Sequence, residues 1–213
     1  MKKYFTKTPW WLKKIFPSYI WSVDTDENIL YLTFDDGPHP VATPLVLDLL
    51  KQYNARASFF CIGRNVKEYP AIYERILAEG HAVGNHTFDH LNGWKTNNEV
   101  YLQNVAAASE YIESGLFRPP YGRIRSSQAR KMRDATNPRP LKIVMWDVLS
   151  GDFDTRLKGE KCFRNIIENA GPGSIIVCHD SEKALPRLQF FLPELMKYYS
   201  GKGFGFESLK FLD

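Results

Sequence analysis

The chain has 213 residues and a mass of 24.6 kDa, which suits one domain, or at most two small ones, with a sizeable core. Its 44% hydrophobic and 14% aromatic content excludes an intrinsically disordered protein. The formal net charge of +4 is too small for a nucleic-acid-binding protein unless the basic residues cluster, so we expect no nucleic-acid partner.

Cysteine usage and the N-terminus bear on the compartment. Cys61, Cys162 and Cys178 match no zinc-knuckle or CxxC spacing, which favours free thiols in a reducing compartment. No apolar run of seven or more residues precedes Asp24, so the sequence predicts neither a signal peptide nor a transmembrane helix. We therefore expect a cytoplasmic or peripheral protein. The sequence does not indicate an oligomeric state.

Residues 1–27 are expected to form an N-terminal arm ahead of one larger domain at 28–213. The arm mixes aromatic residues such as Trp10 and Trp11 with lysines. Such a pattern fits either an interfacial membrane helix or an arm whose rings pack on the domain while its lysines face water. Pro9 and Pro17 leave too short a helix for strong insertion, which favours the packed arm, with at most weak peripheral membrane contact.

The rest of the chain alternates between apolar runs and helical stripes. Strands are predicted at 29–34, 57–62, 81–83, 116–118, 142–148 and 174–178, with a further strand at 204–209. Helices are predicted at 41–53, 70–79, 97–114, 126–134, 161–169 and 186–199. This alternation is typical of parallel βα units, so we expect an α/β protein built as a closed or nearly closed βα barrel.

Two adjacent carboxylates, Asp35 and Asp36, follow the first of these strands, and Gly37 and Pro38 then stop it. The C-terminal ends of strands carry the chemistry in α/β proteins. Neighbouring carboxylates repel each other unless a cation compensates them, and a metal ion is the usual cation. Because Asp-Gly and Gly-Pro are also ordinary turn dipeptides, the pair alone fits a simple turn equally well.

His86 and His90 lie four residues apart just after the predicted strand at 81–83. At that spacing both imidazoles can face one ion. An added aspartate completes the one-oxygen, two-nitrogen ligand set that zinc, cobalt or iron(II) accepts with open positions. A lone histidine is more often structural, but two at this spacing together with the Asp35-Asp36 pair favour a metal site.

Two further strand ends carry polar residues. The stretch 118–122, with Arg118 and Tyr121, is either a stiff surface loop or a device that aims a guanidinium at a carboxylate and offers backbone N–H groups to an oxyanion. The apolar strand at 174–178 leads into His179, and a carboxylate beside that imidazole would keep it protonated, as a general acid requires. Strand alternation points Cys178 away from this site and into the core.

These stretches, in this order, resemble the polysaccharide deacetylase family, carbohydrate esterase family 4, which shares the chitooligosaccharide deacetylase homology domain. The resemblance spans about residues 28–207. Its most specific motifs are Thr33-Phe34-Asp35-Asp36-Gly37-Pro38 and His86-Thr87-Phe88-Asp89-His90. The resemblance implies a distorted (β/α) barrel with about seven parallel strands and a catalytic domain at 28–213. It also implies metal-dependent removal of N-acetyl groups from an acetylated carbohydrate partner of chitin or peptidoglycan type.

The resemblance also implies a metal centre and a base. One divalent ion, zinc or, as the second choice, cobalt, would be bound by Asp36, His86 and His90. Asp35 would be the general base, and Arg118 would orient it.

The general acid and the substrate contacts follow from the same resemblance. His179 would be the acid, and the Asp152 carboxylate would tune it. Tyr121 would stabilise the oxyanion through its backbone N–H, and the residues that contact the substrate would be Tyr121, Trp146 and Val177.

The sequence departs from the family pattern at two positions. Phe153 follows Asp152 where the family usually has Trp, and Val177 stands where it usually has Leu. The second change removes one methylene, worth about 0.8 kcal/mol of apolar contact. Neither change affects a metal ligand or a proton carrier, so we expect activity to survive.

Other functions stay open on the same scaffold. They are an O-acetyl esterase, an amidohydrolase acting on a small amide, and a carbohydrate-binding protein without turnover. A binding protein needs no acid and base, so Asp35 and His179 argue against the last. The sequence does not encode substrate length, and Trp94 is either a packed loop residue or a platform for stacking sugars.

Overall fold

The computed structural model describes residues 4–135 and 141–213, so the first three residues of the predicted arm lie outside it. The strands are β1 Ile29–Asp35, β2 Ser58–Cys61, β3 Ala82–Asn85, β4 Leu116–Phe117, β5 Lys142–Ile143, β6 Val148–Leu149, β7 Ile175–His179 and β8 Gly205–Phe206. The α-helices are α1 Trp10–Ile15, α2 Ala42–Gln52, α3 Gly63–Glu68, α4 Pro70–Ala78, α5 Asn98–Ser109, α6 Ser126–Ala135, α7 Gly159–Ile167 and α8 Leu185–Ser200. Two short 3₁₀ helices are η1 Pro120–Gly122 and η2 Leu209–Leu212.

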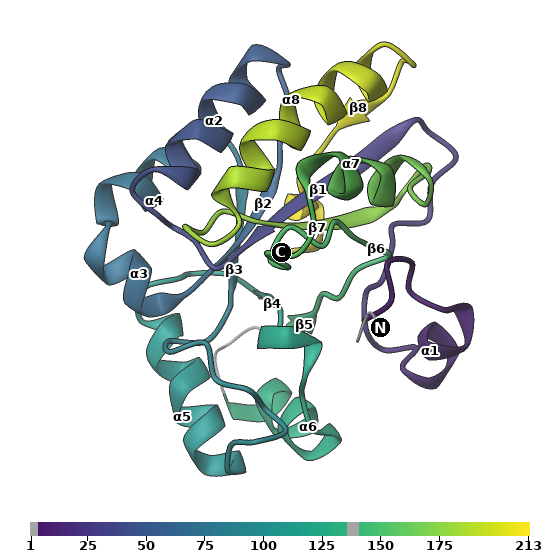
Figure 1. The fold of residues 1–213 in the computed structure, drawn as a ribbon. Coiled ribbons are helices and arrows are strands. Elements are labelled where there is room, and N and C mark those ends of the chain that lie inside the picture. The colour runs from purple at the N-terminus through teal and green to yellow at the C-terminus, as the bar shows by residue number, and fades with distance from the viewer. Residues whose placement is uncertain (1–3, 136–140) are drawn as a thin grey trace.

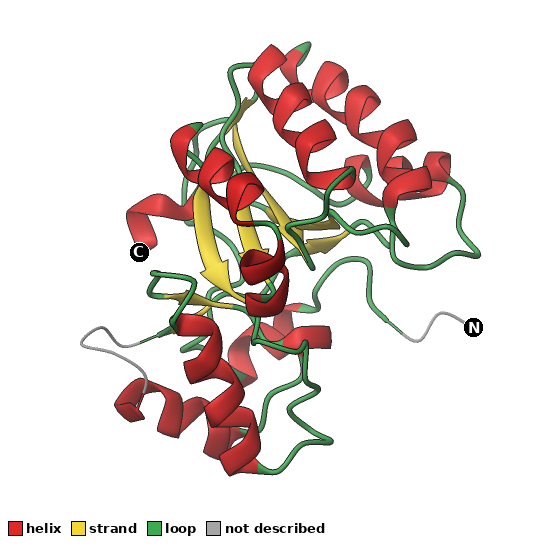
Figure 2. Cartoon of the chain, turned by 90° about the vertical axis from the view of Figure 1, so that its left-hand side faces the viewer, coloured by secondary structure: helices red, strands yellow, loops and turns green. Residues whose placement is uncertain are grey.

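The described strands form one parallel sheet that curls into a barrel. Seven of them run in the order β5-β4-β3-β2-β1-β7-β6, and β8 pairs with the start of β1. Helices surround the strands, with α2, α4, α7 and α8 towards one end of the sheet and α5 and α6 towards the other (Figures 1 and 2). This arrangement confirms the expected distorted (β/α) barrel with about seven parallel strands.

The segment at 142–149 closes the barrel. It was predicted as one strand, but it is two short ones: β5 pairs with β4 at one edge of the sheet, and β6 pairs with β7 at the other. The residues between them cross from edge to edge. The N–H of Val144 donates to Phe117 O, and that of Asp147 donates to Ile175 O. One continuous strand would pair with a single edge, so the crossing breaks it.

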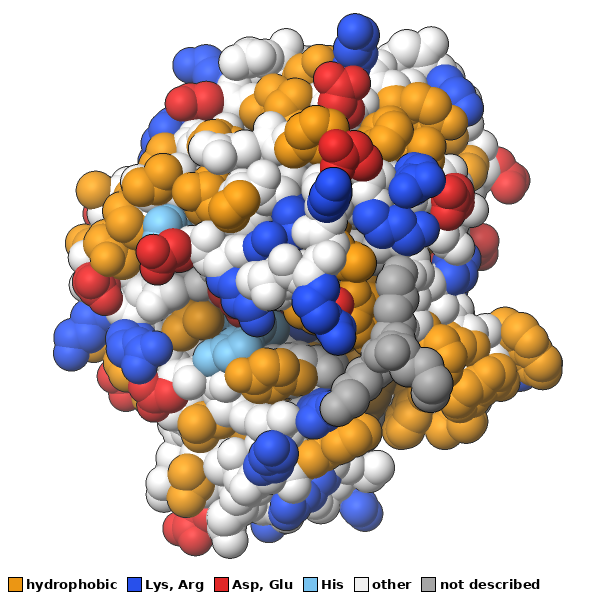
Figure 3. All heavy atoms as spheres, in the orientation of Figure 1, with side chains coloured by type: hydrophobic (Ala, Val, Ile, Leu, Met, Phe, Trp, Pro, Cys, Tyr) orange, Lys and Arg blue, Asp and Glu red, His pale blue; other side chains and the backbone are white. Residues whose placement is uncertain are grey.

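The chain before β1 lies along the outside of this crossing segment. Ile20 exchanges backbone hydrogen bonds with Ile143 and Met145, and the N–H of Thr8 donates to Asp147 O. Both Lys7 and Lys13 form ion pairs with the buried Asp147 carboxylate, at 2.5 and 2.7 Å. Apolar side chains gather on the surface over α1 (Figure 3, lower right). Among residues 4–135 and 141–213, no helix is both long and apolar enough to cross a membrane.

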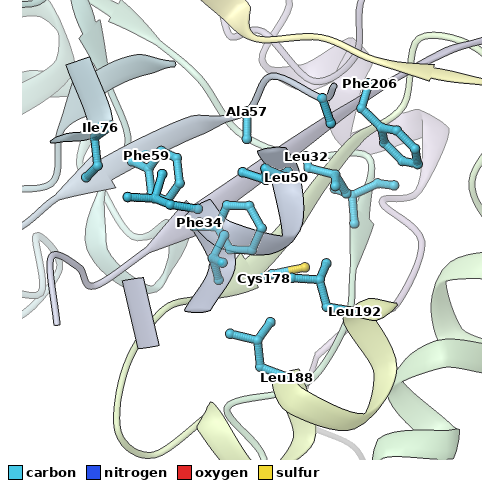
Figure 4. Close-up of a cluster of buried hydrophobic side chains, with 14 of the residues drawn as sticks. Leu32, Phe34, Leu50, Ala57, Phe59, Ile76, Cys178, Leu188, Leu192 and Phe206 are labelled. Carbon is cyan, nitrogen blue, oxygen red and sulfur yellow. The ribbon is translucent and has the colours of Figure 1, made fainter. Parts of the chain in front are cut away.

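The largest core cluster lies between the sheet and the helices packed on it. β1 is buried along nearly its whole length. Its inward side chains meet residues from β2, α2 and α8, as Figure 4 shows for Leu32, Phe34, Leu50, Phe59, Leu188 and Leu192. Cys61, Cys162 and Cys178 are all buried thiols of this chain, and Cys178 lies in the same cluster, as predicted.

Two further elements differ from the expectation. Helix α3 was not predicted, because its six residues carry only Val66 as a large buried side chain and therefore show no helical stripe. The strand predicted at 204–209 is only two residues long, and η2 follows it. Both differences affect connections rather than the order of the sheet.

Asp147 provides a test of how firmly the arm is held. Burial would raise the pKa of this carboxyl, but hydrogen bonds from Lys13, Lys7 and Ser174 outweigh it and lower the pKa. We expect Asp147→Asn to lower the free energy of unfolding at pH 7 by about 1–2 kcal/mol, because water still reaches both ammonium groups.

The same contribution should depend on pH. A lowered pKa stabilises the fold above the unfolded-state value of about 3.9, and the effect is lost as the pH falls through the lower folded-state value. Denaturant unfolding of both proteins at pH 7 and pH 3 should therefore show the difference shrinking at pH 3. An equal difference at both pH values would contradict this account.

Candidate metal centre and active site

The two carboxylates at the end of β1 have different surroundings. Asp35 is the last residue of the strand and is buried, with its Oδ1 accepting a hydrogen bond from Arg118 Nη1 at 2.7 Å. Asp36 has a φ of 78°, so the chain leaves the strand direction at that residue. A strand alone would send the two side chains to opposite faces, and the left-handed backbone at Asp36 lets both serve one site.

Asp36 approaches both predicted histidine ligands. Its Oδ1 lies 3.1 Å from Nε2 of His90 and 3.7 Å from Nε2 of His86. One ligand atom from each of the three residues lies within 4.8 Å of the others. The Asp36 side chain is 25% exposed, but its Oδ1 atom is buried and accepts no hydrogen bond from the described residues. An unsatisfied buried oxygen facing two imidazole nitrogens fits a divalent cation.

The tautomer of His86 suits the same role. Its Nδ1 lies 2.8 Å from the carbonyl oxygen of Arg118, and a carbonyl can only accept, so Nδ1 carries the proton. The lone pair of Nε2 is then left facing Asp36. Burial lowers the pKa of His86 to about 4, despite the nearby carboxylates, and keeps the ring neutral. His86 is therefore prepared to ligate a cation.

Arg118 is fully buried and reaches three parts of the barrel. Besides Asp35 on β1, its guanidinium donates to Thr33 Oγ1 and to the carbonyl oxygens of Val144 and Met145 on the crossing segment. The group also stacks over the Phe60 ring at 4.0 Å. Burial lowers the pKa of Arg118, although the contact with Asp35 opposes that effect. The side chain predicted to orient Asp35 does contact it.

His179 ends β7 and lies beside Asp35 in the sheet. The two residues are direct partners in the parallel register. Asp152 holds His179 at two points, since its carboxylate accepts from the ring nitrogen Nδ1 at 2.7 Å and from the backbone N–H at 2.8 Å. Burial would lower the pKa of His179, but Asp152, then Asp36 and Asp35, outweigh it and raise the pKa to about 10.

The predicted substrate-contacting residues lie in different settings. The Tyr121 side chain is 61% exposed, and its ring lies 4.6 Å from that of His90. Trp146 is half-buried and packs so close to Gly122 that any side chain there would clash with the indole. Val177 is buried on β7, on the same face as His179 by strand alternation. Phe153, in place of the family's Trp, lies edge-on to His179 at 5.3 Å.

Sequence reasoning missed two residues that shape the site. Asp180, next to His179, is fully buried, accepts from Thr43 Oγ1, and packs against Gly37 in the turn after β1. Burial raises the pKa of Asp180 to about 8. Asn65 on α3 donates to the Asp36 carbonyl. The sequence shows Asp180 next to His179 at the end of an apolar strand but indicates no role for it, and nothing there singles out Asn65.

Strained backbone is concentrated at the candidate metal centre and its loops. Five described non-glycine residues have a positive φ, and four of them, Asp36, Thr87, His90 and Tyr121, belong to the site or its loops. Left-handed φ values are uncommon outside glycine and tend to occur where function requires them. On the face shown in Figure 3, pale blue histidine side chains lie in a hollow. The arrangement can hold one cation beside an arginine-bound carboxylate and a carboxylate-bound imidazolium.

Comparison with known proteins agrees with this geometry. A family profile described as Polysaccharide deacetylase matches residues 22–138. A chitooligosaccharide deacetylase of Azorhizobium caulinodans is 38% identical over 74% of this chain and 76% of its own length. A peptidoglycan-N-acetylglucosamine deacetylase of Bacillus cereus is 35% identical over 83% of this chain and 86% of its own.

A solved structure is also similar along most of the chain. It is a peptidoglycan N-acetylglucosamine deacetylase in complex with 4-naphthalen-1-yl-N-oxidanyl-benzamide. The TM-score is 0.81 at 31% identity, and the match covers 95% of each chain. Fold and sequence thus point to the same family.

Arg118→Met tests the buried guanidinium. The change leaves Asp35 buried without a partner and removes the donors to two carbonyls, so we expect a loss of about 3–5 kcal/mol in unfolding free energy. Arg75→Met is the matched control. Arg75 is likewise ion-paired, with Asp48 and Glu79, but at the surface, where the loss should stay below about 1 kcal/mol. Equal losses in denaturant unfolding would contradict the role given to Arg118.

Proposed function

We propose that this chain, which belongs to the polysaccharide deacetylase family, hydrolyses the acetamide of N-acetylated amino sugars and releases acetate. Its substrate would be an oligosaccharide or polysaccharide of chitin or peptidoglycan type. One observation carries the proposal: the Oδ1 atom of Asp36 is buried, accepts no hydrogen bond from the described residues and faces the Nε2 atoms of His86 and His90. Asp35 and His179 lie at the same ends of the paired strands β1 and β7.

Asp36, His86 and His90 would hold one divalent ion. Two imidazole nitrogens and one carboxylate suit zinc best, and cobalt accepts the same set. Such an ion polarises an acyl carbonyl and lowers the pKa of water. The proton on His86 Nδ1, held by the Arg118 carbonyl, supports this assignment because it leaves Nε2 free to ligate.

Asp35 would act as the general base that takes a proton from the attacking water. A base needs to be ionised and fixed in place. The hydrogen bond from Arg118 Nη1 to Oδ1 supports the second condition, since it holds the carboxylate in place and leaves Oδ2 for the water.

His179 would donate a proton to the departing amine nitrogen. The pKa of about 10 means that the ring carries its proton at neutral pH, and the bond from Nδ1 to Asp152 leaves Nε2–H as the donor. The backbone N–H of Tyr121 would stabilise the developing oxyanion. Water adds to the amide carbon, and the C–N bond breaks as the nitrogen gains its proton, giving acetate and the free amine.

The acyl group and sugar would contact Tyr121, Trp146 and Val177. The exposed Tyr121 ring beside His90 supports a sugar contact. Val177 and Phe153 border His179, which supports an apolar wall for the acetyl methyl group. We infer, in addition, that residues 28–213 form the catalytic domain.

The decisive experiment pairs metal analysis with an activity assay. We expect about one zinc or cobalt ion per purified chain, and acetate release from N-acetylglucosamine oligomers that a chelator abolishes and added zinc restores. His86→Ala should lose both the metal and the activity. Metal without acetate release, but with release from acetylated xylan, would favour the O-acetyl esterase. A chain that binds no divalent ion would refute the proposal.

Asp35→Asn and His179→Gln test the two proton carriers. Each should lower kcat by about 10²- to 10⁴-fold, the range for loss of a general acid or base, while the metal content stays unchanged. Asp48→Asn is the control, because Asp48 also pairs with an arginine but lies on the surface of α2. Undiminished turnover in either variant would show that its side chain carries no proton in this reaction.

A further inference from the structure

Large apolar side chains are exposed together at the N-terminal arm. Phe5, Trp10, Trp11 and Ile15 are 60%, 68%, 44% and 60% exposed. We call these four residues the α1 patch. It forms the orange bulge over α1 at the lower right of Figure 3. Single exposed apolar residues are ordinary, but a contiguous group usually marks a binding surface.

The side chains of the patch are neighbours. Trp11 and Ile15 are four residues apart on α1 and share one face, and the Phe5 ring meets Trp11 edge-on at 6.4 Å. Trp10 lies one position further round, with the Lys14 ammonium 4.9 Å from the centre of its ring. Leu12 packs inward against a core cluster, yet α1 has no buried residue. The helix therefore presents most of its apolar surface to the outside.

The patch is held in place rather than carried by a frayed end. Just before α1, Thr8 bonds to Trp146 O and Asp147 O. Lys7 and Lys13 clamp the chain on both sides of the first helical turn by pairing with Asp147. One face of α1 is held firmly, whereas aromatic side chains on the other face are exposed. Exposed aromatic side chains add little to the stability of the fold, which indicates that this face binds a partner.

Shape and charge indicate the partner. The helix α1 stands out from the body of the protein in Figure 1. Of the four patch residues, Ile15 lines a cavity at the base of the helix, together with Phe16 and Tyr19. Residues 1–23 contain five lysines and no aspartate or glutamate. Tryptophan and phenylalanine beside lysine are the side chains that settle at the boundary between lipid headgroups and acyl chains.

We propose that the α1 patch docks this protein on the surface of an anionic lipid bilayer. Trp10, Trp11, Phe5 and Ile15 enter the headgroup boundary, and Lys14, whose ammonium lies beside the Trp10 ring, faces the anionic headgroups. The six-residue helix is far too short to cross a bilayer, so the contact is peripheral and reversible. The proposal does not depend on the proposed hydrolase activity.

Sedimentation of the full chain with lipid vesicles tests the proposal. The protein should sediment with phosphatidylcholine vesicles that contain about 30% phosphatidylglycerol, less with phosphatidylcholine alone, and less again at high salt, which screens the lysines. The double variant Trp10→Ser, Trp11→Ser should bind at least about tenfold more weakly, since both side chains provide most of the apolar contact. Its circular dichroism spectrum should match the wild type.

Trp94→Ser is the matched control. Trp94 is 57% exposed, within the range of the two patch tryptophans, but lies outside the arm, so its loss should leave vesicle binding unchanged. Three results would overturn the proposal. They are wild-type protein that stays in solution with anionic vesicles, a double variant that binds as well as the wild type, and concentration-dependent self-association that the double variant abolishes. The last result would show that the patch is covered by a second copy of the chain.

Discussion

The fully buried guanidinium of Arg118 links strand β1 to the segment that crosses between the two edges of the sheet. Removing the charge of Arg118 from water is expensive, and the structure offsets that cost with one carboxylate, one hydroxyl, two carbonyls and the face of Phe60. The partners come from β1, from β2 and from the segment that crosses between the sheet edges. Because the charge is satisfied only when all of them are in place, closure of the barrel and the position of Asp35 depend on each other. The carbonyl of Arg118 then fixes His86, so the same residue orients both the predicted base and a predicted metal ligand.

Charge is divided between neighbouring acids at this barrel end. Asp35 faces Arg118, and Asp36 faces His86 and His90. Burial would raise the pKa of Asp36, but the contact with His90 and the charge of His179 outweigh it and keep the pKa below its usual range. Asp180 lies close to both and has no cationic partner among the described residues, so burial raises its pKa. Asp36 and Asp180 thus differ in protonation because their partners differ. Parallel register supplies the last element, since pairing β1 with β7 places His179 level with Asp35.

The sequence predicted the arrangement of the candidate site correctly where its side chains lie at the ends of strands. A strand followed by Asp35 and Asp36, a second followed by His86 and a third ending in His179 sufficed to predict that these side chains gather, because parallel strands share one edge. Backbone conformation was not predictable, since the left-handed φ values at Asp36 and His90 depend on contacts from distant segments, such as Asn65 bonding to the Asp36 carbonyl. The single strand expected at 142–148 failed for a related reason: local apolar content cannot reveal that its two ends pair with different neighbours.

The N-terminal arm is connected to this chemistry through the crossing segment. Arg118 depends on the carbonyls of Val144 and Met145, and the arm residue Ile20 bonds to the chain on both sides of Val144. At its other end, Tyr4 donates to Asp154 and packs on Phe153, which in turn packs on His179. The arm therefore supports the base side of the site through backbone hydrogen bonds and the acid side through tilted and edge-on ring contacts. Helix α1 lies between Tyr4 and Ile20 in the chain. A membrane bound at α1 would therefore hold the segment whose two ends support the candidate active site, so membrane attachment and the position of the site residues depend on the same contacts.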